Sequence, residues 1–238
     1  MNAIEIAAIG LQQDGERLKL ISQNVANIST PGFKRQFAVQ SAAFAQSFDQ
    51  AQLAQTLLTV HTDTRAGKLS ATGNPLDVAL AADEFLTVRL ADGSTALTRG
   101  TSLHADATGR LLTLAGLAIQ GADGDLTVPR TAQQVSFDAT GNMLADDVIV
   151  GRLSVAKVST PSSLEYLGNG LYRAGADAGL QMTKPMGLRT GHLESSNVQT
   201  TQEMVQMMTT MRHAETMSKL IQGADDMLDK AIRKFGEL

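Results

Sequence analysis

Two residue types are missing from the 238-residue sequence, cysteine and tryptophan. Without cysteine the chain forms no disulfide, offers no thiolate to a metal and has no cysteine nucleophile. Aromatic residues amount to 4% of the chain, which disfavours a large aromatic-lined ligand pocket. Composition therefore gives no support to a cofactor site or to a small-molecule substrate.

Long apolar runs and an excess of basic charge are missing as well. No stretch of about 18 apolar residues occurs, so no insertion into a membrane is expected. Lys and Arg number 20 against 24 Asp and Glu, so nucleic acid is not an expected partner. The start, residues 1–5, lacks the basic and apolar regions of a cleaved signal peptide. Composition alone predicts a cytoplasmic protein, unless export leaves the N-terminus intact.

Residues 1–35 predict a long amphipathic helix and a turn. One apolar row recurs every seven residues, at Ile4, Leu11, Leu18 and Val25. A second row is made by Ala7, Ile21 and Ile28, and Asp14 interrupts it. This spacing predicts a helix over 1–30 with a heptad seam. Because proline disfavours helical geometry in the residue before it, Thr30-Pro31-Gly32 is expected to end the helix.

Residues 36–70 predict a connecting arm whose conformation is open. Phe33, Phe37, Phe44 and Phe48 are spaced for a second, partly helical stretch. The Gln- and Ala-rich remainder fits an extended arm equally well.

Residues 71–185 predict a β domain. Short alternating runs such as Leu76, Val78 and Leu80 appear between turn signals, of which Asp92-Gly93 marks a hairpin. Further turns are expected at Thr108-Gly109, at residues 122–124 and at residues 140–142. Short strands with closely spaced turns indicate a compact, mostly antiparallel sheet structure.

Residues 186–238 predict a second heptad helix, over 196–235. Its main row is Met207, Ala214, Ile221, Leu228 and Phe235, and a second row holds Met204, Met211 and Ile232. Met217, Ala224 and Ala231 broaden the stripe. Ser196 with Gln199, and Thr200 with Glu203, fit capping boxes.

The predicted fold class is α+β, a mostly antiparallel β domain flanked by two heptad helices that pair as a coiled coil. Each helix has an apolar stripe that must be buried somewhere. One interpretation is a private helical hairpin beside the β domain. The other is burial against neighbouring subunits, which methionine favours weakly because it adapts to imperfect surfaces.

The four histidines, the acidic turn at Asp123-Gly124-Asp125 and the Asp225-Asp226 pair do not combine into a catalytic or metal-binding pattern. We predict no catalytic residue, no metal ligand and no cofactor. The chain is not expected to be an enzyme.

Three segments carry a family resemblance. Residues 24–35, with Asn24, Asn27 and the Thr30-to-Arg35 step, resemble the N-terminal motif of the flagellar rod and hook axial proteins. Residues 191–198, continuing through Glu203 to Glu215, resemble the C-terminal motif of that family. Residues 73–78 resemble the start of its middle β domain, and residues 97–99 and 105–109 fit as well.

Departures from the family pattern occur at three places. Residues 82–86 stand where the family often has a Gly-acidic-Gly-Phe-Phe run, Ala214 stands where an aromatic residue is common, and Leu97 stands where an aromatic residue often precedes Thr-Arg. The length most resembles the proximal rod subunit of the F type, and next the distal rod subunit of the G type.

The resemblance implies a structural subunit of the bacterial flagellar basal-body rod. Such a subunit is exported unfolded by the flagellar secretion apparatus without a cleaved signal peptide, and it polymerises in the periplasm with itself and other rod subunits. Its terminal helices line the axial tube, which forms the export channel, and the rod transmits torque. The alternative is an extracytoplasmic binding module with a β domain on a helical stalk.

The predicted assembly residues follow from the two seams and the two terminal motifs. They are Ile4, Leu11, Leu18, Ile21, Asn24, Val25, Asn27, Ile28, Pro31, Gly32, Phe33, Lys34, Leu193, Glu194, Asn197, Val198, Met204, Met207, Met211, Ile221 and Leu228. The predicted start of the β domain is Gly73, Asn74, Pro75, Leu76 and Asp77.

Overall fold

The computed structural model describes residues 3–41, 57–81, 83–99 and 102–236. The chain divides into two compact units. The helix unit comprises Met1–Ala26, Gln36–Val60 and Gln199–Leu238, and the β unit comprises Asn27–Arg35 and His61–Val198. The helix unit thus collects segments from both ends of the sequence, and the β unit joins residues 27–35 to the middle of the chain.

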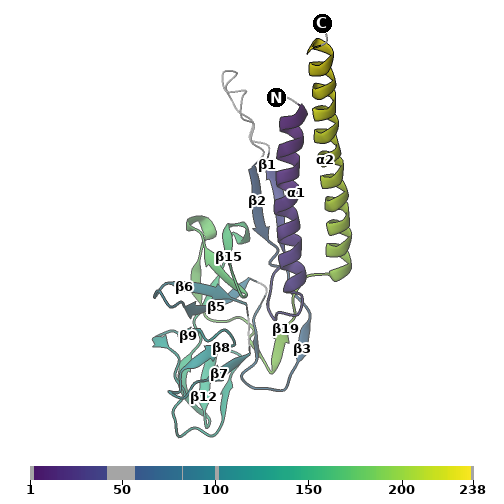
Figure 1. The fold of residues 1–238 in the computed structure, drawn as a ribbon. Coiled ribbons are helices and arrows are strands. Elements are labelled where there is room, and N and C mark those ends of the chain that lie inside the picture. The colour runs from purple at the N-terminus through teal and green to yellow at the C-terminus, as the bar shows by residue number, and fades with distance from the viewer. Residues whose placement is uncertain (1–2, 42–56, 82, 100–101, 237–238) are drawn as a thin grey trace. The chain divides into compact units, whose positions relative to one another are not determined.

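The helix unit holds both long helices, α1 (Ala3–Ala26) and α2 (Thr200–Gly236) (Figure 1). Strands β1 (Gln36–Ser41) and β2 (Leu57–Thr62) form a two-stranded sheet, and β1 contacts α1. The two helices pack against each other. No helix in the described part of the chain is both long enough and apolar enough to cross a membrane.

Both predicted helices exist, but α1 ends four residues before the expected Thr30. Residues after Ala26 form a turn in which Thr30 N donates to the Asn27 carbonyl oxygen at 3.1 Å. Thr30 Oγ1 also donates to Asn27 Oδ1 at 3.2 Å. Short polar side chains compete with helical hydrogen bonds in this way, so the helix stops before the proline.

The predicted connecting arm is extended where it is described. Residues 36–41 and 57–62 are strands, so the helical alternative does not hold for them. Phe44 and Phe48 lie outside the described residues. Phe37 belongs to β1, and its spacing from Phe33 does not reflect a helix.

The β unit is built from short strands and two 3-10 turns. The strands are β3 (Leu69–Ala71), β4 (Val78–Ala79), β5 (Glu84–Arg89), β6 (Thr95–Thr98), β7 (Leu103–Ala105), β8 (Leu111–Thr113), β9 (Ala118–Gly121), β10 (Gly124–Asp125), β11 (Val135–Phe137), β12 (Asn142–Ala145), β13 (Val148–Arg152), β14 (Val155–Lys157), β15 (Leu164–Gly168), β16 (Leu171–Ala174), β17 (Gln181–Thr183), β18 (Arg189–Thr190) and β19 (His192–Glu194). The 3-10 turns are η2 (Pro161–Ser163) and η3 (Ala176–Ala178).

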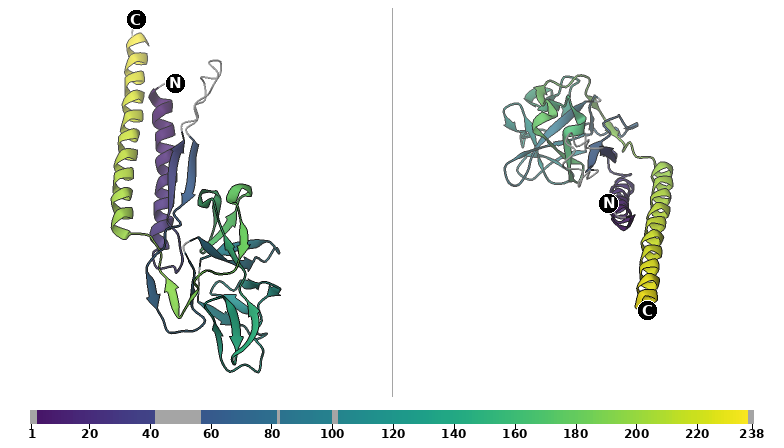
Figure 2. Two further views of the ribbon diagram at one scale, coloured as in Figure 1. Left: turned by 180° about the vertical axis from the view of Figure 1, so that it is seen from behind. Right: turned by 90° about the horizontal axis from the view of Figure 1, so that it is seen from above.

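One large sheet dominates the β unit, with the strand order β15-β16-β6-β5-β9-β8-β7. Strand β5 is central, since it pairs with β6, β9 and β14. A smaller sheet has the order β11-β12-β13, and β4 pairs with β18. Strand β3 pairs with β19, and these two strands are the blue and light-green arrows side by side in the left view of Figure 2. The registers determined within the β unit are antiparallel. The α+β class and the mostly antiparallel middle are therefore confirmed.

The predicted turns connect these strands. Asp92-Gly93 joins β5 to β6, and Asp92 Oδ1 accepts a hydrogen bond from Ser94 N at 2.8 Å. Gly93 has φ +83°, which favours glycine. The hairpin prediction is confirmed.

Two hydrophobic clusters form the core of the β unit. The larger lies under β5, β8 and β9, and Leu86, Val88, Leu111, Ile119 and Met143 in it are fully buried. The smaller surrounds Phe85 and Tyr172, whose ring centroids are 6.0 Å apart in an edge-to-face arrangement. Because β5 contributes Leu86 to one cluster and Phe85 to the other, it is buried on both faces.

Candidate functional site

Helices α1 and α2 run antiparallel in the helix unit. Asn24 near the end of α1 contacts Glu203 near the start of α2. Asp14, in the middle of α1, contacts His213. A Cβ atom on Gly10 would lie 3.6 Å from the side chain of Met217. These contacts belong to one antiparallel register.

The buried row of α1 is Ala7, Asp14, Ile21 and Asn24, which are 3%, 1%, 6% and 0% exposed. This is the row that Asp14 seemed to interrupt. Leu11 of the other predicted row is 38% exposed, while Ile4, Leu18 and Val25 are half-buried. The polar residue therefore marks the most buried face of the helix.

On α2 the face toward α1 includes half-buried Met207, Ala214, Met217 and Ile221. Met204 and Met211, which the sequence placed in a second row, are 53% and 51% exposed. Further exposed apolar residues on α2 are Val205, Met208, Leu220, Met227, Leu228 and Ile232. We call the exposed set of Met204, Met208, Met211, Leu228 and Ile232 the α2 apolar surface.

The Asp14 carboxylate is satisfied by partners on both helices. Oδ2 is 2.5 Å from His213 Nδ1, and Oδ1 is 3.9 Å from Arg17 Nη1. His213 is half-exposed at the edge of the interface, whereas Asp14 is inside it. The histidine thus reaches over the interface to a buried carboxylate.

Asn24 links three segments of the helix unit. Its Nδ2 donates to the Gln36 carbonyl oxygen at 2.8 Å and to Glu203 Oε2 at 3.1 Å. Its Oδ1 accepts from Gln36 N at 2.9 Å. All three residues are buried. This predicted assembly residue fixes the end of α1 to β1 and to the start of α2.

In the β unit a buried carboxylate gathers segments that are remote in sequence. Glu194 Oε1 accepts hydrogen bonds from Lys34 Nζ at 2.7 Å and from Gly67 N at 2.6 Å. Glu194 Oε2 accepts one from Arg99 Nε at 2.9 Å. Glu194, Lys34 and Arg99 are 2%, 0% and 1% exposed. We call these four residues the Glu194 cluster.

The cations of the cluster also bond to backbone carbonyl oxygens. Lys34 Nζ donates to Arg65 O at 2.8 Å, and Arg99 Nη1 donates to the carbonyls of Ala81 and Glu84. Burial and the nearby Arg99 charge hold the pKa of Lys34 below its ordinary value of 10.5, although Glu194 acts in the opposite direction. With Lys34 protonated, the cluster carries two positive charges and one negative charge.

The segment leaving α1 enters the β unit beside this cluster. Gly32 has φ +72°, and its N–H donates to the Glu194 carbonyl oxygen at 2.7 Å. Phe33 is fully buried and packs edge-to-face on Tyr166 at 5.4 Å between ring centroids. Lys34 N donates to the hydroxyl of Tyr172 at 2.9 Å. Gly32 thus takes the left-handed backbone conformation that favours glycine, and Phe33 anchors the segment by burial.

The segment leading to α2 is tied to the same place by Asn197. Asn197 Oδ1 accepts from Arg35 N at 2.7 Å. Asn197 Nδ2 donates to the carbonyl oxygens of Asp63 and Arg65, at 2.8 and 3.0 Å. Val198 is buried beside it and Leu193 is half-buried. The structure thus brings the two terminal motifs together inside the β unit.

The predicted start of the β domain forms a compact turn. Asn74 Nδ2 donates to Asp77 Oδ1 at 3.0 Å, and Leu76 N donates to Asn74 Oδ1 at 3.2 Å. Gly73 has φ +74°, and Asp77 is buried and bridges to Ser102. The turn leads the chain into β4.

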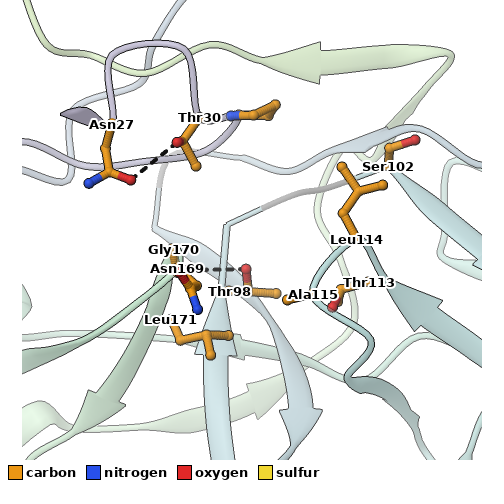
Figure 3. Close-up of a pocket in the computed structure, with 11 residues that line it drawn as sticks. Asn27, Thr30, Thr98, Ser102, Thr113, Leu114, Ala115, Asn169, Gly170 and Leu171 are labelled. Carbon is orange, nitrogen blue, oxygen red and sulfur yellow. Dashed lines mark hydrogen bonds between the residues drawn. The ribbon is translucent and has the colours of Figure 1, made fainter. Parts of the chain in front are cut away.

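A hollow of about 380 Å³ lies between the residue 27–31 turn and the ends of several strands (Figure 3). Its lining is Asn27, Thr30, Pro31, Thr98, Ser102, Thr113, Leu114, Ala115, Asn169, Gly170 and Leu171. None of these lining residues is ionisable. Asn27 and Thr30 bond to each other and Thr98 Oγ1 bonds to Gly170 O, so these polar groups are already occupied within the chain.

Several residues of these contacts were not predicted as site residues. Arg99 was quoted only as part of the resemblance, and Glu203 was quoted there and as a capping-box residue. No sequence pattern pointed to Tyr172 or to the pairing of Asp14 with His213. Their partners are 95 to 199 residues away in the chain. The described residues contain no group of three or more His, Cys, Asp or Glu placed to hold a metal ion.

Comparison with known families gives three matches along the chain, all to proteins of the flagellar axial structure. Residues 4–34 match the family "Flagella basal body rod protein". Residues 79–145 match "Flagellar hook protein FlgE/F/G D1 domain", and residues 189–234 match "Flagellar basal body rod FlgEFG protein C-terminal". The N-terminal match includes the N-terminal motif as far as Lys34. The C-terminal match includes residues 191–198 and α2 as far as Lys234.

Individual relatives cover nearly the whole chain. The flagellar basal-body rod protein FlgF of Escherichia coli is 33% identical over 97% of this chain and 96% of its own length. FlgF of Salmonella typhimurium is 32% identical over 94% of each chain. FlgG of Buchnera aphidicola from Acyrthosiphon pisum is 30% identical over 94% of this chain and 96% of its own length. The chain belongs to the flagellar basal-body rod protein family, within the F and G types.

Proposed function

We propose that this chain is a structural subunit of the flagellar rod that polymerises through its terminal helices. In this proposal its partners are further copies of itself and other rod subunits. The assembled rod is a drive shaft that transmits torque and encloses the export channel. The subunit reaches the periplasm unfolded, through the flagellar secretion apparatus and without a cleaved signal peptide.

The α2 apolar surface carries the proposal. Its Met204, Met208 and Met211 lie near the start of α2, and Leu228 and Ile232 lie near the other end, each more than half exposed. α2 has 37 residues and α1 has 24. In the antiparallel register that sets Gly10 against Met217, the C-terminal part of α2 continues past Ala3. Because about 3.6 residues make one helical turn, Leu228 and Ile232 lie on a different side of α2 from the three methionines, so the α2 apolar surface consists of two patches. Exposed apolar patches of this kind mark protein–protein contacts.

Part of each heptad seam is therefore buried within the chain, and part is free to meet another subunit. The coiled-coil pairing of α1 and α2 belongs to this proposal, as do the assembly roles of the predicted seam residues. Methionine suits such a surface because its flexible side chain adapts to neighbours that meet at slightly different angles. Head-to-tail contacts that do not close into a ring produce a filament.

A binding module is less well supported. The hollow lined by Asn27 and Leu171 offers no ionisable group to orient a ligand. In a second hollow, of about 470 Å³ beside Asn74, the Asp146 carboxylate already accepts hydrogen bonds from Gln133 N and Gln134 N. Catalysis has no supporting constellation in the geometry described above. We therefore propose a structural role and not an enzymatic one.

The test is an exposed substitution on α2. Leu228→Asp places a charge on an apolar side chain that is 54% exposed in the subunit. We expect a strain that carries this variant in place of the wild type to lose swimming in soft agar, while the purified variant keeps its circular dichroism spectrum and thermal midpoint. Thr216→Asp places the same charge on another exposed position of α2 and should leave swimming intact. Normal swimming of the Leu228→Asp strain would contradict assembly through this surface.

A further inference from the structure

Glu194 is joined to donors that the chain supplies much earlier. Lys34 precedes it by 160 residues, Gly67 by 127 and Arg99 by 95. The strand pairs also join late segments to early ones, because β19 pairs with β3 and β18 pairs with β4. The last strands of the β unit thus complete contacts with its first strands.

The two buried cations depend on this one late carboxylate. An unpaired charge taken out of water is costly, and removing one member of a buried pair leaves that cost uncompensated. Asp63 acts on Lys34 more weakly than Glu194 does, and its own carboxylate is bonded to Arg65. Glu84 turns its carboxylate to Met186 N and gives only its carbonyl oxygen to Arg99.

We propose that Glu194 is a folding latch, so that the β unit folds only when the segment carrying Glu194 has engaged Lys34 and Arg99. Most of the strands of the β unit precede this residue in the chain. At typical synthesis rates of about 5–20 residues per second, the interval between Lys34 and Glu194 is on the order of ten to thirty seconds. During that interval Glu194 has not yet been synthesised, so the β unit stays unfolded.

The charge balance of the cluster predicts that removing its anion and removing one of its cations have different effects on stability. Removing Glu194 leaves two cations without a counter-charge, whereas removing Lys34 leaves the Arg99–Glu194 pair intact. Loss of the one anion must therefore be more damaging than loss of either cation. A buried cluster that acted only through its packing would respond to the size of the deleted side chain and not to its sign.

The first test compares full-length variants by thermal unfolding and limited proteolysis. We expect Glu194→Leu, which removes the charge and keeps a side chain of similar size, to abolish the cooperative unfolding transition of the β unit or to lower its midpoint by at least twice as much as Lys34→Met. The triple substitution Lys34→Met, Arg99→Met and Glu194→Leu removes all three charges together and should recover most of the lost midpoint. Equal effects of Glu194→Leu and Lys34→Met, or no recovery in the triple variant, would overturn the proposal.

The second test asks whether the contact forms before the folding barrier. Refolding and unfolding rates of full-length Glu194→Gln are compared with those of the wild type over a range of urea concentrations. A latch predicts refolding at least tenfold slower with unfolding changed less than twofold, because the contact is already made in the transition state. If Glu194→Gln does not fold, Lys34→Met supplies the same comparison. An effect confined to the unfolding rate means that the contact forms late, and it would overturn the latch.

Discussion

At the scale of single residues, Tyr172 combines deep burial with a hydrogen bond to the chain that leaves α1. Its hydroxyl accepts the Lys34 N–H, and the ring belongs to the smaller hydrophobic cluster. Burial raises the pKa of Tyr172 well above its ordinary value of 10.0. The folded protein therefore requires the neutral hydroxyl.

Tyr172→Phe removes the acceptor of a buried N–H and should lower the free energy of unfolding by about 1–3 kcal/mol near neutral pH. The pH dependence has a definite sign. Because the folded-state pKa lies above the unfolded value of 10.0, the tyrosine contributes stability that is complete below that pH and is lost above it. The loss is roughly 1.4 kcal/mol per pH unit.

Urea unfolding of the wild type and of Tyr172→Phe, at about pH 8 and about pH 11, measures this effect. The advantage of the wild type should shrink at the higher pH. Lys34, whose lowered pKa makes its contribution grow as the pH rises toward 10.5, is present in both proteins and largely cancels. A difference that stays constant across this range would show that Tyr172 does not resist ionisation.

Gly67 is a residue where close approach of the backbone requires glycine. A Cβ atom there would lie 1.9 Å from the carbonyl oxygen of Ser195. Gly67→Ala should therefore push the residue 67 segment away from Glu194 and destabilise the β unit by about 1–3 kcal/mol or more. The matched control is Gly15→Ala on α1, where nothing lies within 4 Å and alanine favours the helix. Equal thermal midpoints of the two variants would contradict this contact.

The sequence analysis identified Lys34 and Glu194 of the Glu194 cluster as site residues, but it did not identify their partners. Lys34 and Glu194 were both placed in the terminal motifs, but no local pattern showed that they meet across 160 residues. Arg99 entered the sequence analysis only as part of the family match at residues 97–99. A buried ion pair has no periodicity, so its members can be recognised from one sequence only when the fold is known.

At the scale of elements, the heptad spacing predicted both helices but not which row would be buried. The interrupted row of α1 is the most buried one, because the carboxylate of Asp14 finds His213 on α2. Hydrophobic periodicity treats a charged residue as a sign of solvent exposure. That rule fails where a partner satisfies the charge inside the interface.

The Asp14–His213 contact can be measured by a double-mutant cycle. His213→Ala leaves the buried carboxylate with Arg17 at 3.9 Å and should lower the stability of the helix unit by about 1–3 kcal/mol. In the Asp14→Ala background the same change should cost much less, giving a coupling of about 0.5–3 kcal/mol. Helix content followed during urea unfolding provides the four stabilities. Strictly additive effects would contradict the contact.

The turns were the most predictable elements. Asp106-Ala107-Thr108-Gly109 and Asp138-Ala139-Thr140-Gly141 share one four-residue sequence and one set of hydrogen bonds. In both, the Asp Oδ1 atom accepts from the N–H and the hydroxyl of the threonine two residues later. This chemistry is local, so it can be predicted from the sequence.

At the scale of the whole molecule, the hydrophobic core lies in one unit and the exposed α2 apolar surface lies in the other. The β unit contains both hydrophobic clusters and the Glu194 cluster. The helix unit keeps a narrow seam between α1 and α2 and leaves the α2 apolar surface exposed. The β unit also includes residues 27–35, which the sequence assigned to the N-terminal helix and its turn. The sequence near residues 27–35 could not predict that this segment belongs to the β unit, because Phe33 and Lys34 are buried against residues far away in the chain.

The absence of cysteine allows the central claim, assembly through α2, to be measured directly. Leu228→Cys introduces a single thiol at a position that is 54% exposed in the subunit. A maleimide reagent should label this thiol in the purified subunit and should fail to label it in isolated flagellar basal bodies, where a neighbouring subunit covers it. Equal labelling of the purified subunit and of the assembled basal body would contradict the account.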